Sequence, residues 1–235
     1  MTATSHLSDN LTLLDHETSL LVRTAATLDD ATIRAASRCE GWTRAHVLSH
    51  IARNADGLAN LVSWAVTGTP VAMYESSQAR DEDIAAGSTR SAQEILNDLT
   101  ESAARFAAAA TGLAGPPERS EVEMRTGRRV LGGQLPTLRL LEVVFHHVDL
   151  DAGYTFADAD PGFVRRAIRN AVERMKASGN APAISLRGDN GDTWSVGEGA
   201  QEVTGTNAAL LLWLARSDGA GVSGKDALPE LPAWG

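Results

Sequence analysis

The chain has 235 residues, and its 21 basic against 30 acidic residues give a formal net charge of −9. Phosphate polyanions require clustered basic side chains, and no dense basic run occurs, so we expect no nucleic-acid partner. No apolar run approaches the ~20 residues of a membrane-spanning helix, and the first residues do not resemble a signal peptide. We therefore expect no membrane partner and a cytoplasmic location.

Four segments before residue 155 repeat apolar residues at helical spacing. We expect helices over 6–28, 43–66, 91–110 and 136–152, with Thr43 as the N-cap of the second helix. Ser91 and Glu94 form a capping box that opens the third helix. Four such helices predict a four-helix bundle over residues 1–155.

Two connections within this bundle are less regular. Residues 70–90 show neither a strand pattern nor that of a long helix, so we expect a long loop, which in a compact domain often carries function. Residues 121–131 are either a short hairpin or an irregular stretch.

The pattern changes after residue 155, which predicts a small C-terminal α+β domain over 156–235. Asp160 and Pro161 begin a helix that runs to about residue 177. Two alternating segments, 183–187 and 193–196, predict strands around a turn, and 201–204 is a candidate third strand. Thr206 is the expected cap of a last helix through residue 216, followed by a loose tail over 218–235.

Two pairs of polar residues on predicted helices are candidates for a metal-binding or catalytic site. His46 and His50 lie four residues apart on the second helix, and Glu142 and His146 have the same spacing on the fourth. Side chains four apart share one helix face, and both pairs lie among apolar residues. A buried carboxylate is costly unless it is paired or binds a metal. Two imidazoles, a carboxylate and an open position are typical of catalytic zinc.

Spacing alone leaves alternatives open. The histidine pair is also compatible with a structural role, and Glu142 with an ion pair to an arginine such as Arg139. In another alternative, His46 and His50 are both metal ligands, and Glu142 contacts a ligand and not the metal itself.

Three further residues are candidates for the site. Asp149, three residues after His146, either orients that histidine or is a solvated carboxylate at the helix end. Arg80 and Arg216 are either bidentate partners of substrate carboxylates or solvated surface residues. The single cysteine, Cys39, cannot form an intrachain disulfide and is interpreted as a small, partly buried apolar residue.

The run EGWTRAHVLSH, residues 40–50, resembles the motif that opens the second helix of the mycothiol-dependent maleylpyruvate isomerase family, a group of DinB-like metal-binding bundles. Segments within 64–88, 142–150 and 215–219 are also similar to this family, so the likeness covers nearly the whole chain except 112–135. The resemblance implies a zinc or other divalent ion bound by His50, Glu142 and His146. It places His46 near the site without making it a ligand, and it implies a catalytic, substrate- or thiol-binding role for Arg216.

The resemblance also implies an enzyme with mycothiol as its small-molecule thiol cofactor and an electrophilic acid as its substrate. A metal-bound thiol is deprotonated, and the thiolate is the reactive species. The implied reaction converts a cis enoyl diacid of maleylpyruvate type to its trans isomer, with Arg80 and Arg216 holding the carboxylates. Two alternatives remain: a mycothiol S-transferase that conjugates an electrophile, and a non-catalytic metal-binding bundle.

Overall fold

Residues 3–198 and 201–232 are described by the computed structural model, in which the chain divides after Tyr154 into two units. The boundary lies one residue before the one expected from the sequence. Within the part of the chain that the structure describes, no helix is long and apolar enough to cross a bilayer.

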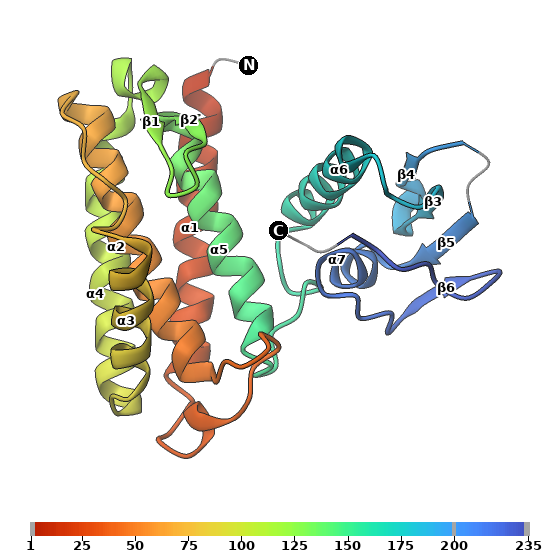
Figure 1. Ribbon diagram of the computed structural model, residues 1–235, viewed down its shortest axis with the longest axis horizontal. Coiled ribbons are helices and arrows are strands. Elements are labelled where there is room, and N and C mark those ends of the chain that lie inside the picture. The colour runs from red at the N-terminus through yellow and green to blue at the C-terminus, as the bar shows by residue number, and fades with distance from the viewer. Residues whose placement is uncertain (1–2, 199–200, 233–235) are drawn as a thin grey trace. The chain divides into compact units, whose positions relative to one another are not determined.

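The first unit is a four-helix bundle, as the sequence predicts (Figure 1). Its long helices are α1 (Ala3–Ala25), α2 (Arg44–Thr67), α4 (Ala92–Ala110) and α5 (Leu135–Asp149). Helix α2 packs on α4 and α5, and α1 packs on the same two helices from the other side, which closes a ring of four around an apolar core. A short hairpin of β1 (Glu121–Glu123) and β2 (Arg129–Leu131) precedes α5. The residues of α2 that enter the core are almost completely buried, among them Val47, Leu48, Ile51, Leu58 and Leu61.

Side-chain caps fix where two of these helices begin. The Thr43 hydroxyl accepts a hydrogen bond from the backbone N–H of His46, and Nδ1 of His46 accepts from the backbone N–H of Thr43. This is a capping box in which histidine replaces the usual glutamate or glutamine. Ser91 and Glu94 form the expected capping box at the start of α4. Because the cap residue Thr43 lies about two turns before His50, the cap sets the register of that residue.

The expected long loop over 70–90 contains a helix, α3 (Ser77–Ser88), so this expectation was wrong in part. Ser76 caps its first turn, and the Arg34 guanidinium donates to the carbonyls of Ser88, Thr89 and Arg90 at its end. Such bonds satisfy carbonyls that a helix end leaves without partners. The helix buries little apolar side chain besides Ile84, which is why it lacks the periodic pattern of the other four.

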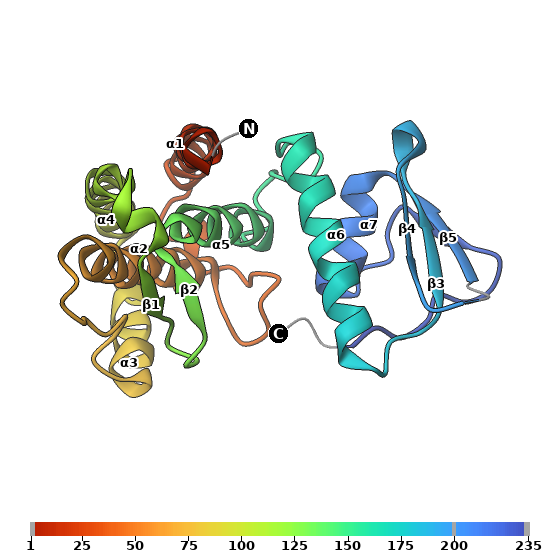
Figure 2. The same cartoon turned by 90° about the horizontal axis from the view of Figure 1, so that it is seen from above.

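The second unit is a small α+β fold, as expected. Its sheet has the order β4-β3-β5-β6, with β3 (Ile184–Arg187) antiparallel to β4 (Thr193–Val196) and parallel to β5 (Gln201–Gly205). Helices α6 (Pro161–Ser178) and α7 (Asn207–Arg216) pack together on one face of this sheet (Figure 2). The tail expected to be loose contains β6 (Val222–Gly224), which pairs with β5; its last residues, 233–235, lie outside the described part.

Candidate metal centre

Three side chains from two helices converge on one point in the bundle. Nε2 of His50, from α2, lies 3.0 Å from Oε2 of Glu142 and 3.1 Å from Nε2 of His146, both on α5. The third side of this triangle, between His146 Nε2 and Glu142 Oε2, is 3.5 Å. The two imidazole rings are perpendicular, with centroids 4.7 Å apart. We call these three residues the donor triangle.

The dimensions of the donor triangle can be compared with those of a zinc site. Tetrahedral zinc binds nitrogen and oxygen ligands at about 2.1 Å. Two ligands at the tetrahedral angle are then about 3.4 Å apart, whereas the observed sides are 3.0 to 3.5 Å. The three donors therefore fit one face of a coordination tetrahedron. The fourth corner would remain for another ligand.

A buried carboxylate supports His146 from behind. Oδ2 of Asp149 lies 2.9 Å from Nδ1 of His146 and 3.4 Å from Sγ of Cys39. The side chain of Asp149 is fully buried, so it is not the solvated carboxylate that the sequence left open. A carboxylate that accepts from Nδ1–H fixes the tautomer in which Nε2 faces the donor triangle. Cys39, partly buried as expected, is part of this support.

Electrostatics within the triangle shift the ionisation of all three residues. Burial lowers the pKa of His50 and outweighs the opposing effect of Glu142. Burial also opposes the charge on His146, but its hydrogen bonds to Asp149, Cys39 and Glu142 raise its pKa well above the usual value. Burial would likewise raise the pKa of Glu142, yet hydrogen bonds from the two histidines hold it well below the usual range. The site thus keeps an ionised Glu142 between one histidine that resists protonation and one that favours it, and a metal ion bound through Nε2 of His146 would displace that proton.

Arg80 approaches the triangle from α3. Its Nη2 lies 3.1 Å from Nδ1 of His50, and its Nη1 forms an ion pair with the exposed Asp81 at 2.6 Å. The Trp42 ring packs edge-on against His50, with centroids 5.5 Å apart. One side of His50 therefore faces an arginine, while the other faces Glu142 and His146.

Two other residues considered in the sequence have different partners. His46 bonds to Thr43 and, through Nε2, to the Ser88 hydroxyl at 3.1 Å, so it belongs to the helix cap. Its ring also stacks on Trp42, which packs against His50. Arg139 is not the ion-pair partner of Glu142, because its Nη1 donates to the Ile51 carbonyl and to the Asn54 amide oxygen. It ties α5 to α2 one turn from the ligands.

Arg216 is the last residue of α7 in the second unit, where its Nη1 donates to the Ala215 carbonyl at 2.8 Å. It is partly exposed. Its role in the site remains a prediction.

The chain matches one family model and two solved structures. Residues 14–151 match the family described as the mycothiol maleylpyruvate isomerase N-terminal domain. The chain belongs to this family. Two solved structures, both of a mycothiol-dependent maleylpyruvate isomerase and one of them a histidine-to-alanine variant, are 31% identical to the chain. Each superposition covers 100% of this chain and 100% of the matched chain, with a TM-score of 0.90. No curated protein matches the chain significantly.

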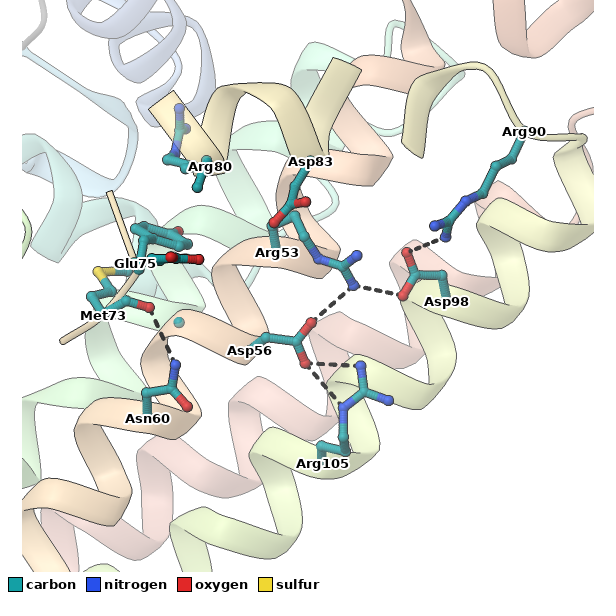
Figure 3. A pocket seen from close by; sticks show the side chains of 13 residues that line it. Arg53, Asp56, Asn60, Met73, Glu75, Arg80, Asp83, Arg90, Asp98 and Arg105 are labelled. Atoms are coloured by element: carbon teal, nitrogen blue, oxygen red, sulfur yellow. Dashed lines mark hydrogen bonds and ion pairs between the residues drawn. The ribbon is translucent and has the colours of Figure 1, made fainter. Parts of the chain in front are cut away.

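Sequence reasoning missed a set of charged residues beside the centre. Arg53 and Asp56 of α2, Asp98 of α4 and Arg105 of α4 form a chain of ion pairs along a pocket (Figure 3). The three-residue spacing of Arg53 and Asp56 on the predicted second helix was an available signal. Nothing in the sequence alone linked them to Asp98, since Arg53 and its partner Asp98 lie 45 positions apart.

Proposed function

We propose that the chain is a mycothiol-dependent isomerase that converts a cis enoyl diacid of maleylpyruvate type to its trans isomer. The observation that carries this proposal is the donor triangle, whose two imidazoles and one carboxylate have the spacing of zinc ligands. Membership of the family supports the choice of thiol and substrate.

His50, Glu142 and His146 would hold zinc or another divalent ion. When bound at this centre, the ion and the thiol would supply a thiolate, the nucleophile whose reversible addition to a double bond allows cis and trans isomers to interconvert. Asp149 keeps His146 in the ligating tautomer through the bond to Nδ1. An isomerisation of this kind would regenerate the thiol in each turnover, so the cofactor would not be consumed.

Arg80 is the proposed partner of a substrate carboxylate within the bundle. A guanidinium only donates hydrogen bonds, so its contact with Nδ1 of His50 requires that ring to carry its proton on Nε2. Ligation through Nε2 would place the proton on Nδ1 and end this bond. The Arg80 guanidinium would then be available to a carboxylate. Arg216 is proposed to bind the second carboxylate.

The proposal is tested by incubating metal-loaded protein with catalytic mycothiol and maleylpyruvate, and following both the trans product and the free thiol. We expect many turnovers per thiol. Stoichiometric loss of thiol would instead identify an S-transferase, and absence of any thiol-dependent reaction would leave only a metal-binding bundle.

Substitutions connect the activity to the donor triangle. His50→Ala, Glu142→Ala and His146→Ala are each expected to abolish both metal binding and turnover. His16→Ala, which changes an exposed histidine on α1, is the matched control and should retain both. Full activity in any of the three triangle variants would contradict the metal-dependent mechanism.

A further inference from the structure

A pocket of about 540 Å³ opens on the first unit between α2, α3 and α4 (Figure 3). This volume lies within the range of about 300–1,000 Å³ that is usual for small-molecule sites. We call it the α2–α3–α4 pocket. The mechanism proposed above uses only Arg80 of its lining, so most of its polar side chains have no assigned role.

The charges along the α2–α3–α4 pocket neutralise one another. Arg53 donates to Asp56 at 2.8 Å and to Asp98 at 2.6 Å. Arg105 donates to the other oxygen of Asp56, and Arg90 to the other oxygen of Asp98. A dianionic substrate would have to approach two carboxylates to reach these guanidinium groups. The pocket is therefore a poor site for a diacid.

Two more carboxylates remain available in the same lining. Glu75 and Asp83 form no ion pair or hydrogen bond within the part of the chain that the structure describes. Asn60 adds an amide, whose nitrogen bonds weakly to the Met73 carbonyl at 3.4 Å. Carboxylates only accept, guanidinium groups only donate, and amides do both. A hydroxyl group donates and accepts at once, so this mixture suits a ligand with many hydroxyl groups and little net charge.

Arg80 connects the pocket with the donor triangle. It lines the pocket, and its Nη2 lies 3.1 Å from Nδ1 of His50. Tyr74 also lines the pocket, and the Arg80 guanidinium carbon lies 5.9 Å from the centre of its ring. A ligand anchored in this pocket would extend toward His50.

We propose that the α2–α3–α4 pocket binds the hydroxyl-rich, non-reacting part of the thiol cofactor, a sugar or cyclitol group. This inference rests on the function proposed above, because it takes mycothiol, a thiol carried on a glucosaminyl-inositol group, as the cofactor. The pocket then selects the cofactor by its hydroxyl groups, while the donor triangle takes its sulfur.

The test measures equilibrium binding by calorimetry to the full-length, zinc-loaded protein. The three probes are mycothiol, thiol-free glucosaminyl-inositol, and N-acetylcysteine, which has the thiol without the sugar. Asp83→Asn removes an acceptor charge from the pocket, and Glu82→Gln changes the adjacent exposed carboxylate of α3 as the matched control. Zinc content and melting temperature confirm that both variants are folded and loaded.

Asp83→Asn is expected to weaken binding of mycothiol and of glucosaminyl-inositol about tenfold or more, the loss typical of a hydrogen bond to a charged group. The two variants, Asp83→Asn and Glu82→Gln, should bind N-acetylcysteine with the same affinity. Equal affinities of both variants for all three probes would overturn the inference. So would weakened binding of glucosaminyl-inositol with mycothiol unaffected, because the pocket would then bind the free sugar without contributing to binding of the cofactor. Loss of the isomerase reaction with intact probe binding would refute the proposed function alone.

Discussion

Replacing Asp149 with alanine should weaken zinc binding without altering any of the three proposed ligands. Oδ2 of Asp149 lies 2.9 Å from Nδ1 of His146, in a fully buried side chain. Carboxylates that orient a ligating histidine are worth about 10- to 100-fold in metal affinity. We therefore expect the zinc dissociation constant to rise by that factor, which corresponds to about 1.4–2.7 kcal/mol.

The measurement is a competition titration of the metal-free protein against a chromophoric zinc chelator at fixed pH. Asp149→Asn should fall between wild type and alanine, because the amide oxygen still accepts from Nδ1–H while the charge is lost. Asp151→Ala is the matched control, since that carboxylate is mostly exposed and pairs with Arg38 at 3.0 Å. If Asp149→Ala bound zinc within twofold of the control, then Asp149 would not orient His146 as a ligand.

Three other predictions follow from the same contacts. In the metal-free protein, the lowered pKa of His50 should make the free energy of unfolding fall as pH drops below about 6.5. The raised pKa of His146 should make the same free energy fall as pH rises above that value. Urea unfolding across this range should therefore show a maximum in stability, which His146→Gln should shift to higher pH. Arg80→Gln should raise KM for the diacid about 10- to 100-fold with zinc content unchanged, whereas the exposed Arg128→Gln should leave steady-state kinetics unaltered. Arg139→Met should lower the free energy of unfolding by about 1–3 kcal/mol, because the Ile51 carbonyl and the Asn54 side-chain oxygen lose a buried donor. An unchanged urea denaturation curve would mean that this contact does not hold α2 to α5.

The sequence predicted the parts of the fold that depend on local pattern. The helices of the bundle have apolar residues at helical spacing, and Thr43 and Ser91 mark the starts of two of them. The paired spacing of Glu142 and His146 placed two donors on one face of one helix. What spacing could not supply was the register between α2 and α5, which decides whether His50 or His46 meets that face. Packing decides for His50, while the His46 ring turns back to cap its own helix.

The parts that were missed depend on contacts between distant segments. Helix α3 has little apolar side chain to bury, so its sequence lacks the periodicity of a packed helix. Strand β6 exists because Val222 and Ser223 pair with β5, and a three-residue strand is too short to show an alternating pattern. The Arg53–Asp98 ion pair joins α2 to α4, and only the packing of those helices brings it together.

The packing of the segment around α3 explains why Arg80 can stand between the pocket and the centre. The segment approaches α2 at glycines: a Cβ on Gly57 would lie 2.9 Å from Cε1 of Tyr74, and one on Gly87 would lie 2.9 Å from Oγ of Ser49. Contacts this short would force the segment away from α2, and Arg80 with it. The proposed metal ligands thus lie on two well-packed helices, whereas the arginine proposed to hold the substrate lies on α3, a polar helix whose close approach to α2 depends on Gly57 and Gly87. Substitutions at those glycines should therefore affect substrate binding before they affect the metal centre.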